Sequence, residues 1–296
     1  MTFLNEIVVT QDSHPQFHVG VPRFWKNRKG ASPEPMKPLA PGSINDGFWR
    51  PFADPVIYND SDGKPVLLSE DLKRMEDEVV TKQGGALFVW NPHCEFATSG
   101  RELHPKFVDA FRLWERSAPG IVYPRIKGMC FARDAYSFVR AVHPFPGVAE
   151  TFQDTNMLQI FVDSDEIYVM GLALNFCVAA GACDIIMLDP SGTVGSKMII
   201  LEDCVKEIPG VPHPSIPNKS LTDVFVEFAK SRGVRFMTSS DAIDMIKSSK
   251  ERRRRTALCV DFNLDFVLKT GALSVPDGED AVENSARFIT ELSKGK

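Results

Sequence analysis

Several features that mark specialised classes of protein are missing from this sequence. No run of about 18 apolar residues occurs in the 296-residue chain, so we expect no transmembrane helix. The opening MTFLNEIVVTQDSHP has no basic stretch followed by a long apolar one, so we expect no secretion signal. Positive charge is not in excess, since 34 Lys and Arg face 39 Asp and Glu, which argues against nucleic-acid binding driven by bulk charge. We find no internal repeat.

Paired cysteine motifs are absent too. The six cysteines stand apart, without a CxxC pair, at positions 94, 130, 177, 183, 204 and 259. In a chain of this length without a secretion signal, we expect free thiols in a reducing compartment, the cytoplasm. Such thiols are available for chemistry as well as for packing.

What is present is typical of a globular α/β protein. Hydrophobic residues make up 43% of the chain and charged residues 25%. Near-continuous apolar runs, which are typical of parallel strands covered on both faces, occur at 6–10, 85–90, 120–126, 166–171, 197–202, 234–239 and 256–262. Between them, 105–116 and 220–232 have the apolar spacing of amphipathic helices, the second with Ser220 as its N-cap and Gly233 at its end. This alternation predicts a doubly wound, mostly parallel sheet with helices on both faces.

Two stretches break the alternation. Eight of the 21 prolines lie within 22–65, which predicts a long ordered loop or lid there. The basic run KSSKERRRR, residues 247–255, is predicted to be a solvated linker between a helix and a strand. The alternative for this run is an RNA-binding segment, which the net charge of −5 disfavours.

Acidic and histidine side chains follow two of the predicted strands. TQDSHPQFH supplies Asp12, His14 and His18, and WNPHC supplies His93. The carboxyl ends of parallel strands are where α/β sheets bind ligands, and a carboxylate with imidazoles suits a divalent metal ion. Such residues are also common in turns, but two clusters together favour a metal site.

Three further residues could carry chemistry. Cys177, in GLALNFCVAAGACD, is predicted near a helix N-terminus, where the pKa of a thiol is lowered. Lys127 ends an apolar strand, and Asp261 ends another in CVDFNLDF. A buried thiol used only for packing and a lysine that extends to solvent are the structural alternatives. A carboxylate in an apolar run is either paired or catalytic, because burying an unpaired charge is costly.

Taken together, these segments resemble the nicotinamidase/pyrazinamidase group of the isochorismatase-like cysteine hydrolases. GLALNFCV is similar to the family's G-[LV]-A-T-x-Y-C-V, and IKG followed by RDAYSF is similar to K-G…D-S-Y-S-x-F. TQDSHPQFH is similar to T-Q-D-W-H-P-x-x-H, and WNPHC with GRELHP is similar to W-P-x-H-C…G-x-x-x-H-P. ALCVDFNLDFVLKTGALSVPDG is similar to V-D-x-Q-N-D-F followed by G-x-L-x-V-P-x-G.

This resemblance implies a six-stranded fold and a metal-dependent amidohydrolase that converts nicotinamide to nicotinate in NAD salvage. It implies Cys177 as nucleophile, Asp261 as general base and acid, and Lys127 as their charged partner. It further implies a metal site, for zinc or else iron or manganese, formed by Asp12, His14, His93 and, as a fourth ligand, His18. Trp90 and Phe266 would lie beside the substrate ring. Ala173 and Cys177 would form an oxyanion hole after a cis peptide bond at 172–173.

The order of the motifs resembles a circular permutation of the family. The segment that opens ordinary members stands here at 257–282, and KSSKERRRR joins it to GVRFMTSSDAIDMI, the usual C-terminal segment. We therefore expect one domain over 1–296, in which 19–84 is a long insertion and 247–255 a linker. Met1 and Lys296 then fall in the connection after the family's first helix.

Some positions depart from the family pattern and leave the substrate open. Ser13 stands in place of Trp, Asn263 and Leu264 in place of Gln-Asn, and Asn175 in place of a common Asp. The same fold acting on another small amide or ureide is the alternative, although the metal motif and Trp90 argue against it. We expect a small-molecule amide as partner and no membrane, and whether the chain forms a homo-oligomer stays open.

Overall fold

A parallel six-stranded sheet forms the centre of the molecule. The computed structural model describes residues 3–82, 85–117 and 119–294, so Met1 and Lys296 lie outside the described residues. The strand order is β11-β10-β9-β12-β1-β8, with every neighbouring pair parallel. The strands are β1 (Glu6–Asp12), β8 (Ile121–Lys127), β9 (Glu166–Leu172), β10 (Met198–Lys206), β11 (Arg235–Met237) and β12 (Arg255–Val260). The predicted fold class is confirmed.

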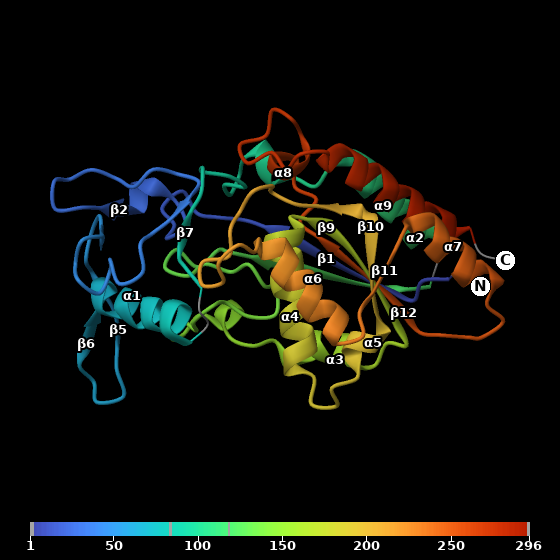
Figure 1. Cartoon of the computed structure of the whole chain (residues 1–296), viewed down its shortest axis with the longest axis horizontal. Coiled ribbons are helices and arrows are strands. Elements are labelled where there is room, and N and C mark those ends of the chain that lie inside the picture. The colour runs from blue at the N-terminus through green and yellow to red at the C-terminus, as the bar shows by residue number, and fades with distance from the viewer. Residues whose placement is uncertain (1–2, 83–84, 118, 295–296) are drawn as a thin grey trace.

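Helices cover both faces of this sheet (Figure 1). One face carries α2 (Pro105–Ser117), α7 (Ser239–Ser248) and α9 (Gly278–Ser293). The other carries α3 (Thr155–Val162), α4 (Ala179–Leu188) and α6 (Leu221–Ser231). Because both faces are buried, the side chains of β9 and β12 are buried along their whole length. This explains why these strands read as continuous apolar runs.

Short elements complete the chain between these helices and strands. They are α5 (Val194–Lys197), α8 (Leu264–Val267), the 3₁₀ turns η1 (Pro22–Phe24), η3 (Ser99–Arg101) and η4 (Ala149–Thr151), and the π-helical segments η2 (Asp77–Lys82) and η5 (Leu174–Val178). In α6 the predicted cap is present: Ser220 and Asp223 form a capping box, and Gly233 follows the helix with a φ of 83°. No helix in the described parts of the chain is long and apolar enough to cross a bilayer.

The segment that we predict to be an insertion, called the insertion below, packs around an apolar cluster that it shares with Leu87, Val89, Cys130, Ala132 and Phe145. It contains β2 (Trp25–Lys26), β3 (Lys37–Pro38), β4 (Arg50–Pro51), β5 (Val56–Asn59), β6 (Pro65–Leu67) and α1 (Leu68–Glu76). In Figure 1 it projects from the carboxyl end of the sheet. A fully buried ion pair between Asp71 of α1 and Arg133 joins the insertion to the loop after β8 (2.6 Å). This segment therefore contains short strands and a helix and is joined to the rest of the chain by a buried ion pair.

The run at 85–90 does not become a strand of the main sheet, which corrects the prediction. Only β7 (Phe88–Val89) is extended, and it pairs antiparallel with β3 of the insertion. Leu87 and Val89 are buried in the insertion's cluster, so the apolar character of this run reflects a different core. Periodicity alone cannot say which core a short apolar run joins.

Candidate active site

A pocket lies at the carboxyl ends of β1, β8, β9 and β12. Asp12 and Lys127 are the last residues of β1 and β8, Asp261 follows β12, and Cys177 follows β9 within η5. The four side chains line or adjoin the pocket and are all buried. Parallel strands bring these sequence-distant residues together because their carboxyl ends share one edge of the sheet.

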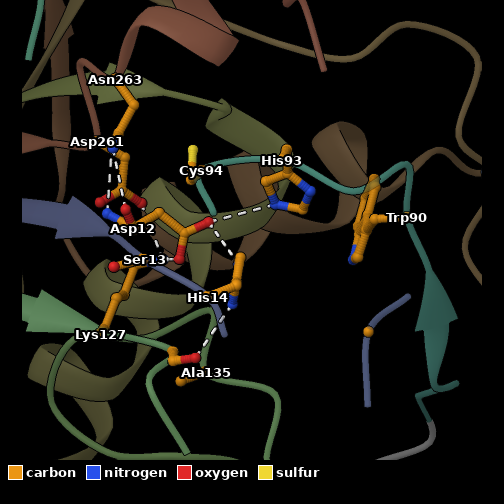
Figure 2. Close-up of polar contacts among 12 residues, drawn as sticks. Asp12, Ser13, His14, Trp90, His93, Cys94, Lys127, Ala135, Asp261 and Asn263 are labelled. Carbon is orange, nitrogen blue, oxygen red and sulfur yellow. Dashed lines mark hydrogen bonds and ion pairs between the residues drawn. The ribbon is translucent and has the colours of Figure 1, made fainter. Parts of the chain in front are cut away.

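Lys127 is at the centre of the charged groups. Its Nζ lies 2.9 Å from Asp12 Oδ1, 2.9 Å from Asp261 Oδ2 and 3.4 Å from Cys177 Sγ. Charge pairing with the two carboxylates holds the pKa of Lys127 well above its ordinary value, although burial lowers it. A buried ammonium ion thus lies between a thiol and two carboxyl groups, as Figure 2 shows for the carboxyl side.

The predicted lowering of the Cys177 pKa is wrong. Burial raises the pKa of the thiol well above its ordinary value, and the nearby Asp261 and Asp12 charges raise it further, while Lys127 acts in the opposite direction. A hydrogen bond from the thiol to Asp261 contributes to the increase. The sequence placed Cys177 correctly before a helix, but it could not show that the thiol would be fully enclosed.

Asp261 has the environment of a proton acceptor. Burial raises the pKa of its carboxyl group above its usual range, although Lys127 lowers it. Thr10 donates a hydrogen bond to Asp261 Oδ1 at 2.7 Å, which fixes one oxygen. Asp261 has a φ of 52°, a left-handed conformation that few non-glycine residues adopt, and such residues often occur at functional sites.

A second group, Asp12, His14 and His93, is able to hold a metal ion. Its ligand atoms lie within 4.8 Å of one another. The Nε2 atoms of His14 and His93 lie 2.9 and 3.4 Å from Asp12 Oδ2 (Figure 2). Their Nδ1 atoms face the backbone oxygens of Gly128 and Asn91 at 3.1 and 2.6 Å.

These contacts fit a cation. A neutral imidazole has one N–H, yet both nitrogens of His14 and of His93 face oxygen acceptors. Donation of Nδ1–H to a backbone carbonyl leaves the Nε2 lone pairs directed at one point beside Asp12, which is the usual arrangement around metal-ligating histidines. The donor set suits zinc, iron or manganese.

The structure does not bring His18 into this group. Its Nε2 donates to the Arg133 carbonyl at 2.9 Å, and its Nδ1 accepts from Gly20 N–H at 3.0 Å. Burial lowers the pKa of His18 well below its ordinary value, so the ring is neutral and has no nitrogen lone pair left. The resemblance of TQDSHPQFH to the family motif suggested His18 as a fourth ligand. The spacing of residues along the chain cannot show which way a ring is oriented.

The pocket, called the slot below, is small and partly lined by aromatic rings. Trp90 and Phe266 line it, as does Phe176, and its free volume is about 30 Å³. Ala173 also lines it and follows the Leu172–Ala173 peptide bond, which is cis.

Several residues that support the site were not identified from the sequence. Asn263 receives the Asp12 N–H at 3.3 Å and donates to the Asp12 carbonyl at 3.0 Å, so it ties β12 to β1 beside the site. Asp265 accepts from Cys94 N–H at 2.7 Å and holds the segment that carries His93. Both lie within CVDFNLDF, so their position near Asp261 was the available signal.

Tyr136 and Asp134 were also missed. Both line the pocket, and Trp90 Nε1 donates to the Tyr136 hydroxyl at 3.1 Å. Burial and the neighbouring Asp134 carboxylate, to which Tyr136 is hydrogen-bonded, raise the pKa of Tyr136 well above its ordinary value. The available signal was RDAYSF, a segment that also carries part of the family resemblance.

The basic run is largely neutralised by acidic side chains. Arg255 lies within β12, and its guanidinium is 2.7 Å from Glu166. Arg253 pairs with Glu166 at 3.0 Å and Arg254 with Glu6 at 2.6 Å. Lys247 and Ser248 end α7 and Arg255 begins β12, so 249–254 connects the two elements. Arg253, Arg254 and Arg255 are engaged by acidic side chains of the chain itself, which disfavours the RNA-binding alternative.

No family model and no curated protein matches this chain. Among solved structures, an Acinetobacter baumanii nicotinamidase/pyrazinamidase is similar over 81% of this chain and 80% of its own, with a TM-score of 0.44 and 20% identity. The yeast nicotinamidase bound to the inhibitor nicotinaldehyde is similar over 78% of each chain, with a TM-score of 0.43 and 18% identity. Similarities this weak do not assign a function to the chain.

Proposed function

We propose that this chain is a cysteine amidohydrolase that converts a small aromatic carboxamide, with nicotinamide as the first candidate, to the carboxylate and ammonia. The observation that carries the proposal is the buried contact of Lys127 Nζ with both Cys177 Sγ and Asp261 Oδ2, at 3.4 and 2.9 Å. A thiol, a carboxyl group and a fixed ammonium ion in one slot are the parts that nucleophilic attack on an amide requires.

Proton transfer begins the proposed reaction. Cys177 is a thiol at rest because its pKa is raised, so it must lose its proton as it attacks the amide carbon. Asp261 accepts that proton, and Lys127 stabilises the sulfur as negative charge develops on it. The raised pKa of Asp261 suits a group that takes up a proton and gives it back during the reaction.

Breakdown of the tetrahedral intermediate follows. The backbone N–H groups of Ala173 and Cys177 are proposed to hold the oxyanion, an interaction that typically lowers the barrier by about 3–4 kcal/mol. Asp261 returns the proton to the leaving nitrogen, so that the C–N bond breaks, ammonia departs and a thioester to Cys177 is left. Water then attacks the thioester while Asp261 accepts its proton. The C–S bond breaks as Asp261 returns that proton to the Cys177 sulfur, and the acid product leaves as the carboxylate after losing a proton to solvent.

Substrate placement is assigned to the remaining residues. Trp90 and Phe266 flank the ring in the slot. Asp12, His14 and His93 would hold the divalent cation, which supplies a Lewis-acid site for a ring nitrogen. This positioning role favours a pyridine or pyrazine carboxamide over an aliphatic amide.

We also propose that 1–296 is a single, circularly permuted domain, with 19–84 inserted and 247–255 joining the family's usual ends. The central place of β12, between β9 and β1, supports this, since β12 carries the segment that opens ordinary members. The Phe3 N–H donates to the Leu292 carbonyl at 3.3 Å, so the chain ends lie together (Figure 1). The six free cysteines support the cytoplasm as its location.

The test is ammonia release from nicotinamide, with and without a chelator. We expect Cys177→Ala to lose activity by a factor of about 10⁴ or more because Cys177 supplies the one thiol among the described residues that line the slot. Cys204→Ala is the matched control, since Cys204 is also buried but lies in the core away from the slot, and it should retain activity. Near-normal turnover by Cys177→Ala would refute the proposal.

A further inference from the structure

A large apolar groove begins where the reaction slot ends. Its volume is about 850 Å³, against about 30 Å³ for the slot. Sites for small organic ligands usually enclose about 300–1,000 Å³. The groove, and not the slot alone, therefore has the dimensions of a complete ligand site.

Three elements and the loop 208–214 line most of the groove. Helix α4 contributes Cys183 and Met187, helix α6 contributes Val224 and Phe228, and β7 contributes Phe88. No Asp, Glu, Lys or Arg is found among the described residues that line it. Met187 is 57% exposed, so apolar surface faces solvent here. A wall without carboxylate, ammonium or guanidinium groups, in which His213 is the titratable imidazole among the described lining residues, favours an apolar ligand group.

The groove and the slot share one wall. Trp90, Tyr136, Phe176 and Ile208 line both spaces. The rings of Trp90 and Phe176 meet edge to face with centroids 4.7 Å apart, and the Trp90–Tyr136 hydrogen bond holds this arrangement. A group attached to a ring beside Trp90 would pass these side chains directly into the groove.

The loop 208–214 is hydrogen-bonded to the segment that carries Cys177. Asn175 donates to the Ile208 carbonyl at 2.8 Å and accepts from the Ile208 N–H at 3.1 Å. Asn175 is two residues from Cys177, so the loop that lines the groove is fixed relative to the thiol. This is also the position where the sequence departs from a common Asp.

We propose that the groove binds an apolar substituent on the ring of the substrate, which makes the preferred substrate a hydrophobic aromatic carboxamide larger than nicotinamide. The proposal rests on the proposed function and specifies its substrate class. The occupant is the ring substituent because Trp90, assigned to the ring, borders both spaces. A substituent on the amide nitrogen and a second copy of the chain are the competing occupants.

The test compares nicotinamide with 5-alkylnicotinamides from methyl to hexyl and with N-alkylnicotinamides of the same lengths. We expect kcat/KM to rise about threefold to fourfold per methylene along the 5-alkyl series, as burial of each CH₂ predicts. The same series binds Cys177→Ala in titration calorimetry with the same dependence on length. No dependence on 5-alkyl length, or a dependence confined to the N-alkyl series, overturns the proposal.

Charged substitutions locate the effect in the groove. In Val224→Glu and Met187→Glu, the ratio of kcat/KM for 5-hexylnicotinamide to that for nicotinamide should fall towards one. Val56→Glu is the matched control, since Val56 is 54% exposed, outside the groove, and should leave the ratio unchanged. A dimer that Val224→Glu dissociates, without any dependence on alkyl length, would assign the groove to a second copy and overturn the proposal.

The two proposals fail in different ways. Hydrolysis of nicotinamide without any effect of 5-alkyl length keeps the amidohydrolase and removes the groove's role. Binding to Cys177→Ala that strengthens with 5-alkyl length, with no hydrolysis of any amide by the unmodified chain, keeps the groove and removes the reaction.

Discussion

Asp12 connects the two halves of the site through its two carboxylate oxygens. Oδ1 pairs with Lys127, and Oδ2 is shared by His14 and His93. Burial raises the pKa of Asp12, but the charges of His14 and Lys127 lower it more, so the pKa of this carboxyl group lies well below its ordinary value. One buried anion therefore serves both the thiol side and the metal side.

The two histidine environments predict different effects on metal content. His93→Ala should lose the bound metal because Nε2 of His93 is directed at the Asp12 oxygen. His18→Ala should keep the metal because both its ring nitrogens are bonded to backbone groups. Metal analysis after desalting measures the stoichiometry, and equal loss in the two variants would contradict the geometry.

Removal of the Lys127 charge should destabilise the protein. Lys127→Met leaves Asp12 and Asp261 buried without their cation, and breaking such a buried pair costs about 3–5 kcal/mol. Lys106→Met is the control, since the Lys106–Glu283 pair is exposed to solvent and its removal should change stability little. Urea unfolding of chelator-treated samples gives both values, and matching midpoints would contradict this assignment.

At the scale of elements, the junction between α7 and β12 is held by a small ion-pair network. Glu166, the first residue of β9, binds Arg253 and Arg255 at 3.0 and 2.7 Å. Burial raises the pKa of Glu166, but hydrogen bonds from Tyr168 and Arg255 and the arginine charges lower it below 4.5 overall. Ion pairs thus hold the start of β12 against the first residue of β9.

This lowered pKa gives a pH dependence of known sign. A carboxyl group whose folded pKa is lowered contributes stability that is present above its unfolded pKa and disappears as pH falls through the folded pKa. Glu166→Gln should therefore lose about 1.5–3 kcal/mol at pH 7, and the loss should fade below pH 4.5. Glu251→Gln, which removes an exposed partner of Arg253, should change little. Chemical denaturation of both variants and the unmodified chain at pH 7 and below pH 4.5 checks this. A loss of stability in Glu166→Gln that grows as the pH falls would contradict it.

At the scale of the whole molecule, the order of the strands in the sheet matters more than their order along the chain. The chain can be reordered so that it begins at Lys250 and ends at Ser249, with Ser293 joined to Phe3 by a few glycines. We expect this reordered chain to fold to the same sheet. The contact between Phe3 N and Leu292 O, at 3.3 Å, makes that join short. Circular dichroism, unfolding and ammonia release compare the two chains. A reordered chain that aggregates would contradict the permutation.

Local signals in the sequence were enough for most of the fold. Apolar runs located the six strands of the sheet, and Ser220 with Gly233 bounded α6. The run at 85–90 was misassigned because its residues are buried against the insertion. The short strands inside the proline-rich segment had no period that could reveal them.

By itself, the sequence determined which residues stand at the ends of strands, because strand boundaries and polar residues are both encoded locally. Only the tertiary structure decided how those residues are used. It turned His18 towards the backbone of Arg133, enclosed Cys177 so that its pKa rises, and opened an apolar groove beside Trp90. The physical reason is that ring orientation, desolvation and cavity shape depend on which distant segments pack together, and residue spacing along the chain does not contain that information.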